Sequence, residues 1–298
     1  MAPASHAPWP PGVPLALAQR ARIEAALARC HAGSGQAMLS DLVFSNLYLF
    51  RQAHDYRLVE GDWPLISGHT YDGSQHAIPL FDPALIPASV LTQILAQHQC
   101  LYPLSKRQVA TLDSGVFEAV ASRDDADYLY AADSFRHYRG VRLIKKRNLM
   151  KQFLAAHSVR SVALEAAVLD DARAILAGWM ADKGKGQGEA DELPCLEALA
   201  HASEFGFQGF LHYADAAPAG FVLGQEIQSG VFVMRFAKGL ARYKGIAQYM
   251  FHHLVMATPQ LHWLNFEQDM GLANFRRTKL SYQPAALLDK FRVRLHHP

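Results

Sequence analysis

A short glycine turn and the cations around it are the first candidates for chemistry. Residues 242–247 read Arg-x-x-Gly-x-Ala. A glycine at such a turn lets a ligand approach the backbone, and the N–H groups that open the next helix can bind an anion. A glycine that serves only a tight turn is the alternative, because short glycine motifs also occur by chance. The donor-binding candidates here are Lys238, Arg242, Lys244, Gly245 and Ala247.

A second group of cations precedes the apolar helical stripe at residues 149–154. Cations at a helix N-terminus oppose the helix dipole, and a bound phosphate or carboxylate would remove that cost. A solvated basic face is the alternative. This group extends the donor-binding set by Lys145, Lys146, Arg147, Asn148 and Lys151.

Two carboxylates follow a short predicted strand, the segment LHWLNFE at 261–267. Glu267 and Asp269 come at its carboxyl end, where ligands of α/β sheets usually bind. Acyl transfer needs one group that takes a proton from the nucleophile and one that protonates the leaving group. We therefore predict catalytic roles for Glu267, Asp269 and Tyr282. Capping of the next helix by the two acids, and a core position for Tyr282, are the alternatives.

Polar residues around these carboxylates form a candidate acceptor site. Asn265 ends the predicted strand and Gln268 lies between the two acids. Arg276 and Lys279 are three residues apart on one face of a predicted helix, where they can contact phosphates. A solvated helix face is again the alternative.

The elements that position these residues alternate in type. Residues 207–239 predict three antiparallel strands with turns at 214–218 and 228–230. The last strand, a helix from 246 and the strand at 261–267 predict a βαβ unit with a parallel pair. Earlier segments predict a hairpin within 56–71 and helices at 15–33, 87–99, 161–184 and 193–205. Within 136–157, Gly140 breaks the pattern, and the apolar stripe at 149–154 predicts a helix after it.

Composition narrows the class of protein. Half of the 298 residues are hydrophobic and the net charge is +2, which does not fit a generic nucleic-acid binder. The three cysteines lie far apart, which fits a reducing cytoplasm, and no Cys/His spacing predicts a metal site. Residues 1–14 predict a flexible tail rather than a signal peptide, and no apolar run is long enough to span a membrane.

The order of elements from Leu193 onward, with the turn at 242–247, resembles the GNAT acyltransferase fold. The whole chain resembles the family of phosphatidylglycerol lysyltransferase C-terminal domains, which is similar in build to the Fem-type aminoacyl-tRNA-dependent transferases. Five segments carry this resemblance, namely residues 44–51, Gly140, 145–153, 265–272 and 276–282. The resemblance implies an α/β fold with mixed sheets and two GNAT-like lobes in tandem, at 15–138 and 139–298. It also implies that a splayed strand near Arg235 polarises the donor carbonyl.

The implied activity of this bacterial-type family is transfer of an aminoacyl group from aminoacyl-tRNA to an amine or hydroxyl, with no tightly bound cofactor. An acyltransferase that uses acyl-CoA or a carrier thioester is one alternative. A non-catalytic binding module is another, because Phe232 and Ala237 stand where relatives often carry acids. The sequence does not distinguish a lipid, a peptide and a small molecule as the acceptor. It does not indicate the oligomeric state either. We expect a cytoplasmic location that allows contact with the inner membrane face.

Overall fold

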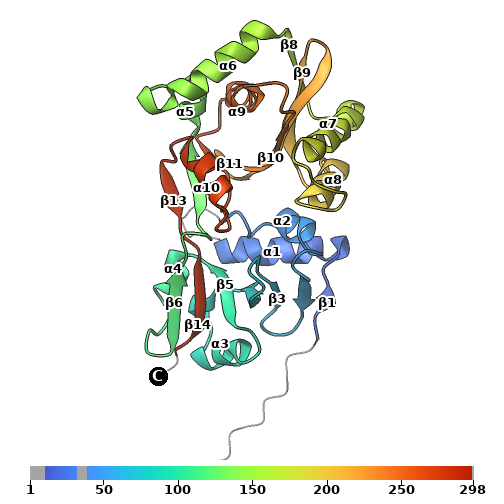
Figure 1. Ribbon diagram of the computed structural model, residues 1–298. Coiled ribbons are helices and arrows are strands. Elements are labelled where there is room, and N and C mark those ends of the chain that lie inside the picture. The colour runs from blue at the N-terminus through green and yellow to red at the C-terminus, as the bar shows by residue number, and fades with distance from the viewer. Residues whose placement is uncertain (1–10, 32–38, 297–298) are drawn as a thin grey trace, which may run out of the picture. The chain divides into compact units, whose positions relative to one another are not determined.

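The computed structural model describes residues 11–31 and 39–296, and divides the chain into two compact units (Figure 1). The first unit comprises Met1–Ala126 and Leu288–Pro298, and the second comprises Asp127–Leu287. This division differs from the expected lobes at 15–138 and 139–298. Residues 127–138 belong to the second unit, and the C-terminal segment returns to the first.

The first unit is built on a seven-stranded mixed sheet of order β1-β2-β3-β4-β5-β14-β6. Its strands are β1 (Val13–Pro14), β2 (Arg57–Val59), β3 (Leu65–His69), β4 (Gln75–Pro79), β5 (Cys100–Leu104), β6 (Phe117–Ala121) and β14 (Phe291–Leu295). Strands β2 and β3 form the predicted hairpin. Val13 and Pro14, which were expected in a flexible tail, pair with β2, and residues 1–10 of that tail lie outside the described residues.

Short helices flank this first sheet. They are α1 (Arg20–His31), α2 (Phe44–Leu49), α3 (Ala88–Leu95) and α4 (Lys106–Val109). Leu91 and Ile94 of α3 pack into a core that contains Leu101 of β5 and Val293 of β14. The predicted end of the first helix at Gly33 lies outside the described residues.

The second unit holds another seven-stranded mixed sheet, of order β13-β7-β12-β11-β10-β9-β8. Its strands are β7 (Asp127–Ala131), β8 (Val159–Ala163), β9 (Gln208–Ala214), β10 (Ala217–Gln228), β11 (Val231–Gly239), β12 (Trp263–Asn265) and β13 (Ala286–Leu288). Strands β9, β10 and β11 are antiparallel, and β11 and β12 are parallel. Both predictions for residues 207–267 are therefore confirmed.

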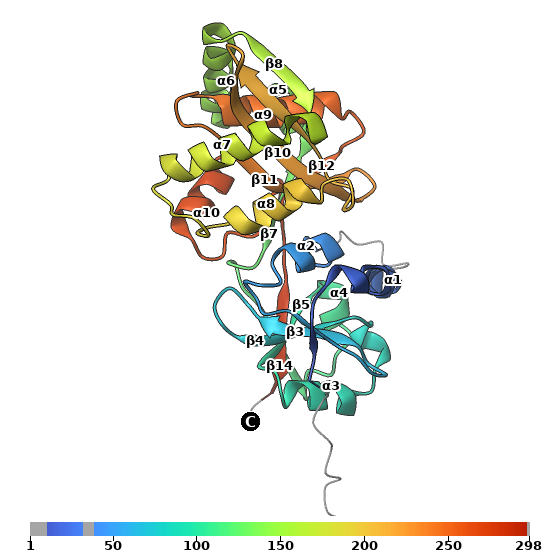
Figure 2. The same cartoon turned by 90° about the vertical axis from the view of Figure 1, so that its right-hand side faces the viewer.

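Helices cover both faces of the second sheet. They are α5 (Ala132–His137), α6 (Ile144–Ala156), α7 (Leu169–Asp182), α8 (Glu192–Ala200), α9 (Ile246–Ala257) and α10 (Ala273–Leu280). Figures 1 and 2 show α9 on one face of β10 and β11 and α7 with α8 on the other. Gly220 of β10 lets α9 pack closely, because a Cβ there would meet Met250 and Ile246.

The predicted helix at 161–184 is wrong at its start. Residues Val159–Ala163 form β8, which pairs antiparallel with β9, and the helix α7 begins only at Leu169. Alanine and valine fit either state locally, so the pairing with β9 decides the outcome. In the described part of the chain, no helix combines the length and apolar character needed to cross a membrane.

Candidate active site

The parallel strands β11 and β12 separate within the second unit and form a fork. They pair only from Val231 with Trp263 to Val233 with Asn265. Beyond that point β12 ends, while β11 continues to Gly239. The two carboxyl ends therefore open a gap of the kind in which α/β sheets bind ligands.

A β-bulge lies at the mouth of this fork. On β10, Leu223 pairs with Phe236 and Gly224 pairs with Met234, so Arg235 between them has no counterpart in the register. A bulge bends its strand and redirects a side chain. It falls where the family resemblance expects the splayed strand.

Arg235 and Glu267 form an ion pair across the fork. The Arg235 guanidinium donates to the Glu267 carboxylate, and the two side chains are 1% and 23% exposed. Glu267 has a left-handed backbone with a φ of 57°. Such backbone strain in a residue other than glycine persists only where surrounding contacts hold it, and it is often found at functional sites.

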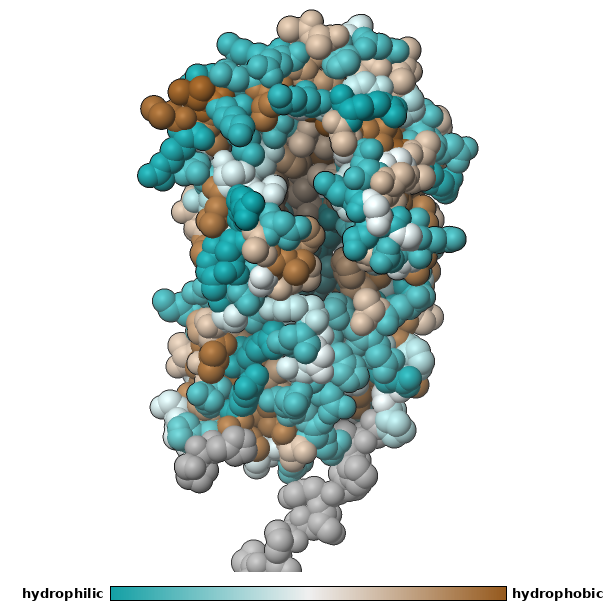
Figure 3. Space-filling view, viewed as in Figure 1, coloured by the Kyte–Doolittle hydropathy of each residue, from teal (hydrophilic) through white to brown (hydrophobic). Residues whose placement is uncertain are grey.

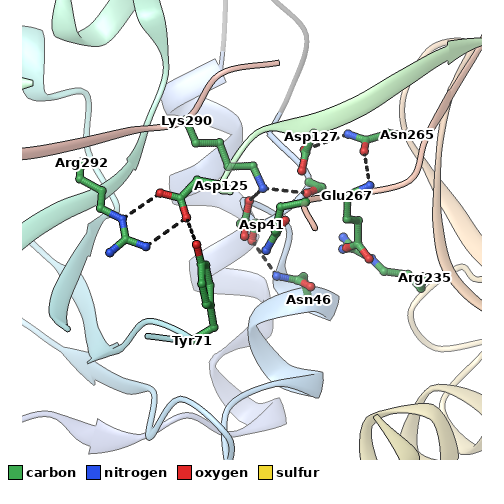
Figure 4. Close-up of polar contacts among 12 residues, drawn as sticks. Asp41, Asn46, Tyr71, Asp125, Asp127, Arg235, Asn265, Glu267, Lys290 and Arg292 are labelled. Carbon is green, nitrogen blue, oxygen red and sulfur yellow. Dashed lines mark hydrogen bonds and ion pairs between the residues drawn. The ribbon is translucent and has the colours of Figure 1, made fainter. Parts of the chain in front are cut away.

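A buried polar chain holds Glu267 in that conformation (Figure 4). The Glu267 N–H donates to Asn265 Oδ1 (2.7 Å), and Asn265 Nδ2 donates to Asp127 Oδ2 (2.9 Å). Asn265 and Asp127 are fully buried. The Asn265 side chain, predicted to contact an acceptor, is thus engaged in orienting Glu267.

Asp269 is held by several donors and is fully buried. Arg276 donates to both carboxylate oxygens (2.8 and 2.9 Å), while Tyr128 Oη donates to Oδ2 (2.5 Å) and the Gly271 N–H to Oδ1 (2.9 Å). Burial favours the neutral acid, but these donors hold the pKa of Asp269 at about 2. Asp269 therefore stays ionised, and a group so engaged suits a structural role better than proton transfer.

Lys279 fixes the loop that follows β12. Its Nζ donates to the carbonyl oxygens of Glu267 (3.1 Å) and Gln268 (2.5 Å), and its own carbonyl accepts from Tyr130 Oη (2.8 Å). Arg276 and Lys279 were expected to contact substrate phosphates, but both charged groups bind this loop. Their helix α10 contains no buried residue, so these polar contacts attach it.

Tyr282 lies in an aromatic core. Its ring packs against Phe135, Phe251 and Phe266 with centroids 5.5–6.4 Å apart, and its hydroxyl accepts from Gln248 Nε2 (2.7 Å). Burial raises the pKa of Tyr282 well above its ordinary value. These contacts support the core position over the predicted proton donor.

The structure separates Lys238 from the turn that it was expected to serve. Lys238 is buried, its ammonium lies 2.6 Å from the Asp191 carboxylate, and it stacks over Trp179 with 3.7 Å to the ring centroid. Arg242 and Lys244 are exposed, and Ala247 is half-buried.

Gly245 is required by packing. Its φ is 99°, and a Cβ there would overlap the carbonyl oxygen of Leu149 in α6 and meet Cβ of Phe153 at 3.0 Å. The backbone of α6 thus fills the space beside this glycine. The geometry explains Gly245 without any ligand.

The predicted donor-binding residues of α6 are of two kinds, those that contact the protein and those that are exposed. Lys146 stacks over the Tyr282 ring at 3.8 Å, and Arg147 donates to the Tyr138 carbonyl (3.3 Å). Burial, with Lys145 nearby, lowers the pKa of Lys146. Lys145, Asn148 and Lys151 are exposed.

The surface of the second unit is hollowed over β10 and β11. Figure 3 shows this hollow between α9 and α10 on one side and α7 with α8 on the other. Arg235 belongs to β11, one of the two strands beneath this hollow. Among the described residues, no cluster of three His, Cys, Asp or Glu could hold a metal ion.

Two residues of the hydrogen-bond network around Asn265 and Asp269 were not predicted from the sequence. They are Asp127 and Tyr128. They orient Asn265 and Asp269 from β7, the strand beside β12. The sequence feature that could have marked them is the acidic run at 124–127, which precedes an apolar segment. The role of these two residues depends on the pairing of β7 with β12, and this pairing joins segments that lie over 130 residues apart in the sequence.

A mixed sheet with a bulged, forked strand pair and a crossing helix is the architecture of a GNAT-like fold. The chain belongs to the family described as phosphatidylglycerol lysyltransferase, C-terminal, whose model matches residues 36–294. The family prediction is thereby confirmed, and the protein is an acyltransferase of this class. None of the curated proteins matches the chain significantly.

Solved structures share this fold. A conserved protein of unknown function from Bacteroides thetaiotaomicron is 20% identical, with a TM-score of 0.78 over 96% of this chain and 99% of that one. FemX is 7% identical, with a TM-score of 0.59 over 93% and 96%. A tandem GNAT protein from the clavulanic acid biosynthesis pathway is 12% identical, with a TM-score of 0.51 over 97% and 99%. The predicted architecture of two GNAT-like lobes in tandem is confirmed.

Proposed function

We propose that the fork transfers an aminoacyl group from aminoacyl-tRNA to an amine or hydroxyl acceptor, a lipid or a small molecule. The observation that carries this proposal is the Arg235–Glu267 pair at the bulge. It combines a buried cation and a partly exposed carboxylate at one opening. Acyl transfer can use both groups, because charge develops on the carbonyl oxygen while the nucleophile loses a proton.

The reaction would proceed by attack of the acceptor on the ester carbonyl carbon. Arg235 and the bulged backbone of β11 would stabilise the oxyanion. Glu267 would take the proton from the acceptor nitrogen or oxygen. The bond to the ribose oxygen then breaks, and that oxygen receives the proton from Glu267.

The packing of Gly245 supports tRNA as the donor. A thioester donor of the CoA type would place its pyrophosphate at the N-terminus of α9, and α6 already contacts this turn. The exposed cations Lys151 of α6 and Arg242 and Lys244 of the turn before α9 remain on the surface, where they can contact a polyanion.

A thioester donor is the second candidate. The observation that favours it is the exposed pair Arg242 and Lys244, which lies just before the N-terminus of α9. The chemistry at the fork would be the same, with sulfur as the leaving atom.

The test offers the purified protein tRNA charged with labelled amino acids, or labelled acetyl-CoA, together with bacterial lipid extract or an amine mixture. We expect label to move to the acceptor from charged tRNA only. Transfer from acetyl-CoA alone would favour the second candidate. Binding of a donor without transfer from either would indicate a non-catalytic module.

A further inference from the structure

We propose that residues 139–145, here called the tip, insert into the surface of a bilayer that contains anionic lipids. The tip joins α5 to α6 and includes two exposed apolar side chains, Val141 (84% exposed) and Ile144 (38%). Exposed apolar side chains that lie together, rather than scattered singly, mark sites of interaction. This proposal does not depend on the transfer reaction.

Cations surround these apolar side chains. Residues 136–151 contain seven Lys or Arg and no Asp or Glu, in a chain whose net charge is only +2. Arg139, Arg142 and Lys145 alternate with the two apolar residues and are exposed. Each cation close to an anionic leaflet is attracted by its negative surface potential.

The tip is anchored to the second unit by one buried side chain and one hydrogen bond. Gly140 adopts a φ of 87° before the short 3-10 helix Val141–Leu143, and Leu143 is buried. Arg142 donates to Gln283 Oε1 (3.1 Å). Figure 3 shows apolar side chains at the end of the second unit where α6 begins, next to hydrophilic ones.

A lipid surface explains the tip better than RNA does. Phosphates of RNA would account for the cations but would leave Val141 in water. At a bilayer interface, apolar side chains enter the acyl boundary while cations contact the headgroups. Leu154 is a further exposed apolar side chain of α6 and is 43% exposed.

The test measures cosedimentation of the whole protein with vesicles of phosphatidylcholine alone or with about 30 mol% phosphatidylglycerol. We expect binding only to the anionic vesicles, weakened by high salt. The double variant Val141→Ser/Ile144→Ser should bind about tenfold more weakly. Arg142→Ser/Lys145→Ser should lose about tenfold as well.

Leu193→Ser provides the matched control. Leu193 is 49% exposed in the same unit but lies beside Asp191 and Glu192, so its loss should not change vesicle binding. Absence of binding to anionic vesicles at low salt would overturn the proposal. Vesicle binding by the Val141/Ile144 variant equal to that of the wild-type protein would also overturn it. A variant that keeps its vesicle binding but loses affinity for tRNA would overturn it in favour of RNA.

Discussion

Glu267 owes its position to its backbone and to two neighbours. Its left-handed conformation places the carboxylate toward Arg235, while the Asn265 side chain accepts its N–H. Asp127 in turn fixes Asn265. The residues that we assign to catalysis therefore depend on a buried chain that touches no substrate.

Asp269 provides a pH-dependent test of the loop after β12. Its pKa of about 2 lies below the ordinary Asp value, so the stabilisation is complete above roughly pH 4 and is lost as the pH falls through 2. We expect Arg276→Met to remove about 2 kcal/mol at neutral pH and to flatten this acid dependence. Urea unfolding at several pH values measures both effects.

Arg277→Met is the control for Arg276→Met, since Arg277 is the exposed neighbour on α10. It should leave the stability and its acid dependence nearly unchanged. An Arg276 variant as stable as the wild-type protein at neutral pH would contradict the role of this ion pair.

Residue types and spacing revealed only part of the site. Glu267 and Asn265 were singled out from their places at the end of a predicted strand, and Arg235 from the family resemblance. The partners of Arg276 and Lys279 could not be found, because one is a buried carboxylate and the others are backbone carbonyls. The long-range pairing of β7 with β12 brings Asp127 and Tyr128 to Asn265 and Asp269, and no local pattern records it.

The contact between α6 and α9 depends on Gly245. Gly245→Ala would impose left-handed strain and a clash with the Leu149 backbone. We expect a loss of about 3 kcal/mol or more in the free energy of unfolding, with or without CoA. Thermal or urea unfolding measures this loss.

Gly206→Ala is the matched variant for Gly245→Ala. Gly206 also has a positive φ, 66°, but a Cβ there would meet nothing within 4 Å. Its substitution should cost only about 1–2 kcal/mol of backbone strain. Equal losses for the two variants would show that the approach of α6 is unimportant.

Elements with a clear period were predictable and short ones were not. The strands at 207–239 and the helix α9 have continuous apolar patterns, and both predictions are confirmed. The five residues of β8 carry too little pattern to distinguish a strand from the start of a helix. The return of β14 into the first sheet also has no local signal.

The C-terminal segment completes the first unit. Strand β14 lies between β5 and β6, and the buried Lys290 forms an ion pair with Asp41. Arg292 donates to both oxygens of Asp125 (2.8 and 3.0 Å), as Figure 4 shows. Removal of this segment would leave the buried Asp125 and the half-buried Asp41 without their cations, which is strongly destabilising for the buried one.

We therefore expect truncation after Leu287 to unfold the first unit while residues 127–287 remain folded. Limited proteolysis with mass spectrometry should detect cleavage throughout residues 39–126 and protection of the second unit. The full-length chain serves as the reference. A truncated protein with equal protection of both units would contradict the division of the chain.

The whole molecule is an acyltransferase whose reaction we assign to one fork. The most direct measurement is the single-turnover rate of aminoacyl transfer from charged tRNA by the wild-type protein, by Glu267→Gln and by Glu204→Gln, whose carboxylate is exposed beside His201. We expect Glu267→Gln to be slower by about a hundredfold or more at unchanged tRNA affinity, and Glu204→Gln to match the wild type. A Glu267→Gln protein that transfers at the wild-type rate would contradict the account.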